Sequence, residues 1–140
     1  MRAAVMTGFG PSAQVRIEDV PSPECRAGEV LIRVAAAGVN PVDWKECEGH
    51  LQPFYSGYTE RWIPGYDAAG TICEVGADVR GFTIGDRVVA FSDRRDSGHN
   101  GTFAEFVRVL APAVCVLPAS VGFFEAAALP TAGLTGYQAL

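Results

Sequence analysis

Short apolar segments that end at glycine or proline recur along this chain and limit the folds it can adopt. Most of these segments are rich in β-branched and small residues, and several alternate polar with apolar positions, so they predict strands. The predicted strands cover residues 3–6, 14–20, 29–39, 70–75, 87–91, 102–109 and 114–117. Many short strands joined by Gly and Pro turns are typical of a mainly antiparallel barrel or sandwich rather than a parallel sheet.

A short helix is predicted over residues 42–48, which follow Pro41 and end before Gly49, a natural helix stop. Pro41 also confines Asn40 to extended conformations, so the local sequence fixes where the Asn40 amide points. The aromatic and irregular stretch 49–63 is either a lid over a ligand or a packed surface loop.

The last twenty residues predict two more helices. Ser120 could cap a helix through residues 123–129, and Pro130 would break it. Thr131 could cap a second helix that runs to Leu140. Because this second helix has no stop signal, we expect the chain to be part of a longer protein.

Length and charge exclude several functional classes. With 140 residues, 49% of them hydrophobic, the chain can form one domain with a real core. The net charge of −5 is mild and the basic residues are scattered, so no nucleic-acid or membrane partner is expected. The apolar runs are well short of the roughly 20 residues of a membrane helix, and the start is too brief for a signal peptide. These features predict a cytoplasmic protein with a small-molecule partner.

Cysteine and histidine usage gives no metal signature. The four cysteines form no C-x-x-C pair, which removes the usual pattern of a zinc ribbon or a redox dithiol. They could form two disulfides, but without a secretory signal we expect four reduced thiols that serve mainly as packing residues. His50 and His99 lie in predicted loops and are expected to be exposed. The cysteines are Cys25, Cys47, Cys73 and Cys115.

Residues 62–76 form the stretch around which a site is expected. A Pro-Gly turn within it precedes Tyr66 and Asp67, and an apolar strand follows at once. Polar groups at the mouth of a packed strand are where a rigid scaffold presents chemistry. We expect segments 38–45 and 85–91 to join this stretch in one wall of an active-site cleft.

These three segments, together with residues 128–140, resemble the medium-chain dehydrogenase/reductase superfamily, in matching order along all 140 residues. The resemblance implies a GroES-like fold, mainly β with short helices in a partly open β-barrel, over residues 1–128. It also implies that residues 129–140 begin a helical connection to a Rossmann domain that binds NAD(P)H. No G-x-G-x-x-G follows a strand here, so that domain lies outside this sequence.

The zinc-dependent members of the superfamily hold a catalytic zinc with a Cys, a His and an acidic residue. The matching positions here are Asn40, Tyr66 and Asp67, and an amide and a phenol are poor zinc ligands. The lobe that would hold a structural zinc, residues 92–101, contains no cysteine. This departure resembles the zinc-free quinone oxidoreductase branch, which reduces quinones or activated alkenes with NADPH. Trp44 followed by Lys45 looks most like members that act on enones and alkenals.

The resemblance gives each candidate residue a role. Without a metal, hydrogen-bond donors must stabilise the developing oxyanion, and Asn40, Lys45 and Tyr66 are the candidates. Asn40 and Thr131 match positions that contact the cofactor, and Tyr66 and Asp67 are candidates for binding substrate. Each residue also has a structural alternative: a turn for Asn40, a solvated side chain for Lys45, cleft lining for Tyr66 and Asp67, and a helix cap for Thr131.

Other functions stay open at this point. The chain could be a relative of zinc-type alcohol dehydrogenases that has lost its metal, or a stand-alone GroES-like binding or scaffold module, as in the co-chaperonins. The predicted helix 131–140 favours the reductase, because a co-chaperonin has no use for a helix that leads to a cofactor domain. The resemblance further implies a homodimer for the full-length enzyme and an inactive fragment when residues 1–140 stand alone. NADH is the alternative cofactor to NADPH.

Overall fold

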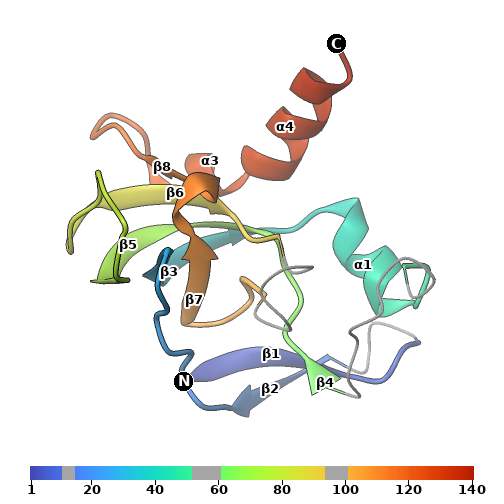
Figure 1. Ribbon diagram of the computed structural model, residues 1–140. Coiled ribbons are helices and arrows are strands. Elements are labelled where there is room, and N and C mark those ends of the chain that lie inside the picture. Colours follow the sequence, from blue (N-terminus) through green and yellow to red (C-terminus); the bar gives the residue numbers. More distant parts are fainter. Residues whose placement is uncertain (11–14, 52–60, 94–100) are drawn as a thin grey trace.

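The computed structural model describes residues 1–10, 15–51, 61–93 and 101–140. In these residues the chain is mainly β with short helices, as predicted (Figure 1). The strands are β1 (Arg2–Thr7), β2 (Val15–Asp19), β3 (Glu29–Gly38), β4 (Arg61–Trp62), β5 (Asp67–Val75), β6 (Arg87–Phe91), β7 (Phe106–Leu110) and β8 (Val114–Val116). The helices are α1 (Pro41–Cys47), α3 (Phe123–Ala127) and α4 (Pro130–Gln138), with a 3-10 turn at Ala111–Ala113.

The strands form two antiparallel sheets. One has three strands in the order β2-β1-β4, and the other has five in the order β7-β3-β5-β6-β8. Within the described residues the sheets do not close into a barrel, but an isolated bridge between Ala3 and Ala104 joins them. Around that bridge the Ala4 N–H donates to the Phe103 carbonyl at 2.8 Å. The partly open barrel expected from the sequence therefore takes the form of two linked sheets.

The five-stranded sheet carries a core on each face. Inward side chains of β3 such as Val30 and Ile32, both 0% exposed, lie in the larger cluster with residues of β5, β6 and β7. On the other face, α3 packs Ala126 and Ala127 in a cluster with Ala69 of β5. Burying such apolar side chains contributes about 25 cal/mol per Å² of apolar surface. The sheet is thus a rigid support on which polar residues at the strand ends can be held.

Most strand boundaries lie within one residue of the prediction, but β5 and β7 begin three and four residues from their predicted starts, and one strand was missed. β5 begins at Asp67, earlier than expected, because it pairs with Gly38 of β3 at that point. β7 begins at Phe106, later than expected, since the chain before it bridges to β1. The two-residue strand β4 pairs with the end of β1 and is too short for a readable alternation.

The predicted helix caps in the last third are wrong. Gly122, not Ser120, is the N-cap of α3, and Leu129, not Thr131, is the N-cap of α4. The chain before α3 is instead fixed by Arg87, whose guanidinium donates to the carbonyls of residues 118, 119 and 121. The same guanidinium lies 4.6 Å from the ring centroid of Phe123. The Arg87 guanidinium, which is distant in the sequence, therefore fixes the chain before α3 in place of the local cap expected from Ser120.

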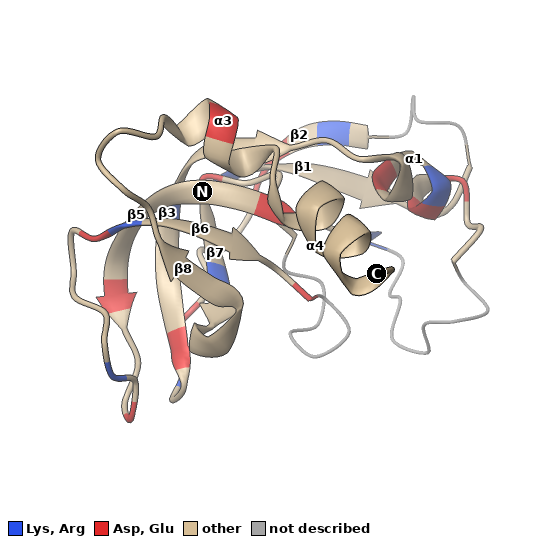
Figure 2. Ribbon diagram, turned by 90° about the horizontal axis from the view of Figure 1, so that it is seen from above, with Lys and Arg blue, Asp and Glu red and all other residues tan. Residues whose placement is uncertain are grey.

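Helix α4 has no buried residue and extends away from the sheets (Figure 1). It carries no charged side chain, whereas basic residues lie singly on other elements such as α1 (Figure 2). Its apolar side chains include Leu134 and Tyr137, which are 42% and 80% exposed. No helix among the described residues is both long and apolar enough to cross a membrane.

The cysteines are free, as expected. Cys47 is buried, Cys25 and Cys73 are half-buried, and Cys115 is exposed, so the packing role predicted for all four is wrong for Cys115. Burial, followed by nearby acidic groups, raises the pKa of the Cys25, Cys47 and Cys73 thiols, which keeps them protonated. His50 is exposed, while His99 lies outside the described residues.

Candidate active site

The three predicted segments meet at one end of the five-stranded sheet. Strand pairing places Asp67, the first residue of β5, between Gly38 at the end of β3 and Phe91 at the end of β6. Asn40 lies two residues after the end of β3 and is the N-cap of α1. The turn at Gly85–Asp86 lies at the opposite end of β6, so only the far end of segment 85–91 reaches this wall.

Asn40 is held by the start of α1. Its φ of −125° and ψ of 160° are extended, as Pro41 predicts. Its backbone N–H donates to the buried carboxylate of Asp43 at 2.6 Å, and its carbonyl accepts from the Asp43 N–H at 3.0 Å. The local turn thus fixes the backbone from which the Asn40 side chain projects.

Asp67 joins three distant parts of the chain. Its side chain is 0% exposed. Its carboxylate accepts from Asn40 Nδ2 at 2.9 Å, from the Thr131 N–H at 3.0 and 3.1 Å, and from Thr131 Oγ1 at 2.6 Å. Asn40 and Thr131 lie 27 and 64 residues away in the sequence. Three predicted site residues therefore form one network.

Gly38 makes this network possible. A Cβ at position 38 would collide with the carbonyl oxygen of Ala127 and would lie 3.0 Å from the Cβ of Asp67. The end of α3 therefore approaches the junction of β3 and β5 closely enough for α4, which starts at Pro130, to bring Thr131 to Asp67.

The other two predicted residues lie differently. Tyr66 is buried, and its ring stacks on Phe91 with centroids 5.9 Å apart, while its carbonyl accepts from the Ser92 N–H at 2.7 Å. Lys45 is exposed on α1, with Nζ 5.6 Å from the ring centroid of Trp44. The structure brings Asn40, Asp67 and Thr131 together, and leaves Lys45 at the surface. The stretch 49–63, expected to be either a lid or a packed surface loop, falls mainly in residues 52–60, outside the described residues.

The donor set does not fit a catalytic zinc. The carboxylate of Asp67 already accepts hydrogen bonds at both oxygens, and its neighbours Asn40 and Tyr66 are an amide and a phenol. Zinc prefers thiolate, imidazole and unencumbered carboxylate ligands. In the described ranges, no three His, Cys, Asp or Glu side chains cluster in a way that could hold a metal.

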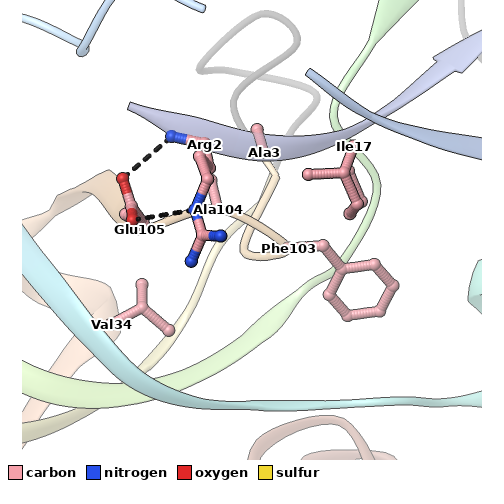
Figure 3. A pocket seen from close by; sticks show the side chains of 8 residues that line it. Arg2, Ala3, Ile17, Val34, Phe103, Ala104 and Glu105 are labelled. Atoms are coloured by element: carbon pink, nitrogen blue, oxygen red, sulfur yellow. Dashed lines mark hydrogen bonds and ion pairs between the residues drawn. The ribbon is translucent and has the colours of Figure 1, made fainter. Parts of the chain in front are cut away.

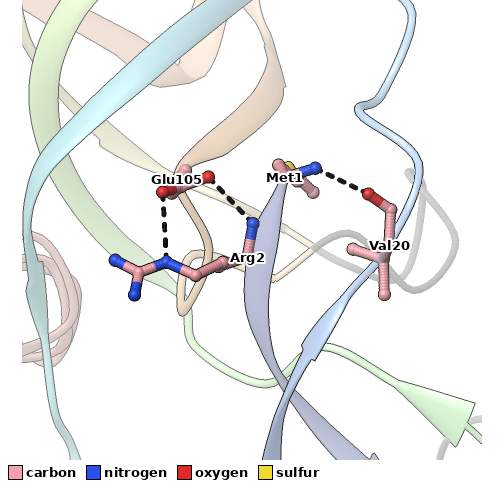
Figure 4. A network of polar contacts seen from close by, with 4 residues as sticks. All are labelled: Met1, Arg2, Val20 and Glu105. Carbon is pink, nitrogen blue, oxygen red and sulfur yellow. Dashed lines mark hydrogen bonds and ion pairs between the residues drawn. The ribbon is translucent and has the colours of Figure 1, made fainter.

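A concave region lies away from this network, between the two sheets. This cavity, of about 450 Å³, is lined by residues such as Ile17, Val34 and Phe103, and none of the predicted site residues lines it (Figure 3). At its edge Glu105 accepts from the Arg2 N–H at 2.8 Å and pairs with Arg2 Nε at 3.4 Å (Figure 4). The hydrogen bond from the Arg2 N–H lowers the pKa of Glu105.

Curated relatives match nearly the whole chain. Residues 26–119 match the family described as Alcohol dehydrogenase GroES-like domain. The chloroplast envelope quinone oxidoreductase homolog of Arabidopsis thaliana is 40% identical over 94% of this chain and 39% of the relative. The 2-methylene-furan-3-one reductase of Solanum lycopersicum is 34% identical over 100% of this chain and 37% of the relative. The chain thus spans about two fifths of the length of these relatives.

Solved structures agree with the sequence matches. A quinone oxidoreductase from Coxiella burnetii superposes with a TM-score of 0.90 at 35% identity, covering 100% of this chain and 44% of that one. A mycobacterial protein solved with NADPH superposes with a TM-score of 0.86 at 30% identity, covering 100% and 40%. With the family match and the shared fold, this chain belongs to the alcohol dehydrogenase GroES-like domain family of the medium-chain dehydrogenase/reductase superfamily.

Proposed function

We propose that this chain is the catalytic domain of an oxidoreductase that transfers hydride from NADPH to a quinone or an activated alkene without zinc. The observation that carries the proposal is the Asn40–Asp67–Thr131 network at the sheet end, where the zinc-dependent relatives would need metal ligands. Relatives whose names are quinone oxidoreductase, 2-methylene-furan-3-one reductase and trans-enoyl reductase support the substrate class. The mycobacterial structure with NADPH supports the cofactor.

The proposed hydride transfer uses no metal ion as a Lewis acid, and this limits the substrates that can react. NADPH, when bound, supplies the hydride. A hydride acceptor that is not polarised by a metal must already be electrophilic, which suits quinones, enones and alkenals. Hydrogen-bond donors must then meet the charge that develops on oxygen.

The chain offers different groups for these tasks. Asn40 Nδ2 gives one hydrogen to Asp67 and retains a second. Lys45 carries its ammonium group on the exposed side of α1, and Tyr66 carries a phenol beside Asp67. We assign substrate contact to these donors, and contact with the nicotinamide side of NADPH to Asn40 and Thr131.

The proposal includes the organisation of the longer protein. Residues 1–128 form the catalytic domain, and residues 129–140 begin the connection to a nucleotide-binding domain that holds the phosphates of NADPH. The exposed apolar side chains of α4 suit a helix that continues into further structure. We also propose a homodimer in the cytoplasm, although some relatives are named as chloroplastic.

The test is a substrate and metal survey of the complete protein that carries this chain. We expect oxidation of NADPH with quinones or enones, no oxidation of saturated alcohols, and activity that survives chelators. Metal analysis after purification without chelator should find no stoichiometric zinc. One tightly bound zinc per chain together with alcohol oxidation would contradict the proposal.

A further inference from the structure

The carboxylate of Asp67 is fully buried, yet none of the hydrogen bonds described for it comes from a cation. Its partners are two N–H groups and one hydroxyl, contributed by Asn40, the N-cap of α1, and by Thr131, the second residue of α4. Burying a charge is costly unless it is well hydrogen-bonded. A carboxylate at the N-terminus of α4 is also favoured by the helix dipole. The fold therefore retains a charged group at this point although an apolar one would be easier to bury.

This carboxylate determines how its partners present their hydrogens. An ionised carboxylate only accepts hydrogen bonds, so the Asn40 side chain must turn its NH2 group, not its carbonyl, towards Asp67. The Thr131 hydroxyl has one hydrogen, which it donates to Asp67 Oδ1 at 2.6 Å. Only the lone pairs of Thr131 Oγ1 then remain for another partner. Thr131 is partly exposed, so those lone pairs can reach a ligand.

We infer that Asp67 is a positioning residue with two effects. It fixes the Asn40 amide in one orientation, and it takes the hydrogen of the Thr131 hydroxyl, so that this hydroxyl can only accept a hydrogen bond from a ligand. This inference rests on the proposed function and replaces the substrate-binding role expected for Asp67. The ligand group that meets Thr131 must then be a donor, such as a primary amide or a sugar hydroxyl. Because Asp67 holds both residues, it also sets the position of α4 relative to Asn40.

The first test compares Asp67→Asn with Asp86→Asn in the complete protein. An asparagine side chain at position 67 would have one acceptor oxygen and one NH2 group in place of two acceptor oxygens, so the Asn40 and Thr131 side chains could not both keep donating to it in their present orientations. We expect kcat to fall on the order of 10²-fold, as for a displacement of reacting groups of about 1 Å, with a smaller change in KM. Asp86 is the matched control, since it accepts from the N–H and hydroxyl of Thr83 at 2.8 and 2.9 Å far from this site. Asp86→Asn should leave both constants unchanged.

A mutant cycle separates positioning from a general structural role. If Asp67 acts through its two partners, Asp67→Asn should cause almost no further loss of kcat in a protein that already carries Asn40→Ala and Thr131→Val. The same loss of kcat in both backgrounds would overturn the inference. Thr131→Ser keeps the hydroxyl and should retain the wild-type kcat, whereas Thr131→Val should not; this pair remains decisive if Asp67→Asn does not fold.

A readout that needs no turnover is amide hydrogen exchange of the same protein. In Asp67→Ala the Thr131 amide should exchange at least about tenfold faster, because it loses a hydrogen bond to a charged acceptor. The Gly133 amide, which donates to the Leu129 carbonyl within α4, is the internal control and should not change. Unchanged exchange at Thr131 would overturn the inference. A wild-type protein that reduces no quinone or enone would refute the proposed function instead, and exchange would then decide the role of Asp67 alone.

Discussion

Two carboxylates in this domain, Asp67 and Asp86, each accept hydrogen bonds from the backbone N–H and the hydroxyl of one threonine. Asp86 and Thr83 are three residues apart in a turn between Val79 and β6. Asp67 and Thr131 are 64 residues apart, and Asp67 is fully buried. The same chemical motif therefore serves a local turn in one place and a tertiary junction in the other.

The two carboxylate motifs act over different ranges in the fold. The hydrogen bonds from Thr83 to the Asp86 carboxylate stay within one turn, so their loss should be felt only locally. The hydrogen bonds between Thr131 and Asp67 hold the start of α4 against the end of the sheet. A further hydrogen bond, from Asn40 Nδ2 to Asp67, links α1 to the same point. Long-range carboxylate contacts of this kind can couple α4, which extends away from the sheets, to the residues of a site.

The largest expected effect concerns Asn40, the third member of the Asp67 junction. Removing one positioned donor typically costs about 10²–10³-fold in kcat, so Asn40→Ala should lower quinone or enone reduction by that order in the complete protein. Its effect on melting temperature should be small by comparison. Unchanged kcat with a large drop in melting temperature would show that Asn40 is only a turn residue.

The comparison of the two carboxylates is tested directly by stability. Asp67→Ala should lower the free energy of unfolding of the 140-residue chain by about 3 kcal/mol, because the donors of Asn40 and Thr131 lose a buried acceptor. Asp86→Ala, at a partly exposed turn, should change it by only about 0.5 kcal/mol. Urea denaturation of both variants gives the two values. Equal losses would mean that burial and sequence separation do not distinguish the two motifs.

Alanine substitutions at two glycines compare the tight packing beside Asp67 with the open surface of α4. Gly38→Ala places a Cβ against the carbonyl of Ala127 beside Asp67, and overpacking of this kind costs about 2 kcal/mol. Gly133 lies in the exposed helix α4, where an added Cβ would meet nothing within 4 Å, so Gly133→Ala should stabilise the helix by up to about 1 kcal/mol. Melting temperatures should move in opposite directions. A neutral Gly38→Ala would show that the junction tolerates a shift of α3.

The smallest expected effect on stability concerns Glu105. Its ion pair spans a long sequence separation but is exposed, so it shows how much sequence separation contributes without burial. Glu105 pairs with Arg2 across 103 residues but is exposed. Because the folded-state pKa of Glu105 lies below its ordinary value of 4.5, the pair stabilises the fold above that pH. The contribution should disappear as the pH falls through the lowered pKa. The difference in melting temperature between the wild type and Glu105→Gln should therefore be present at about pH 6 and shrink as the pH falls below 4.5; a constant difference would contradict this.

The fold was largely predictable from local patterns. Strands such as β3 and β6 follow from runs of β-branched residues, and α1 follows from Pro41 and Gly49. The caps of α3 and α4 were not predictable, because long-range contacts from Arg87 and Asp67 replaced the local hydrogen bonds expected of Ser120 and Thr131. Local sequence signals determine which segments form strands and helices, whereas contacts between distant segments hold the starts of α3 and α4.

Local sequence alone predicts that Asn40 is extended, that Tyr66 and Asp67 lie at the start of a packed strand, and that polar residues gather near the ends of β3 and β5. These features depend on neighbouring residues, since proline, glycine and β-branching act on the adjacent backbone. Only the tertiary structure decided that the Asp67 carboxylate is buried, that it accepts from both Asn40 and Thr131, and that Lys45 stays at the surface. Hydrogen bonds between residues 27 and 64 positions apart leave no periodic trace in a sequence, because they depend on how the sheet brings the ends of its strands and the start of α4 to one place.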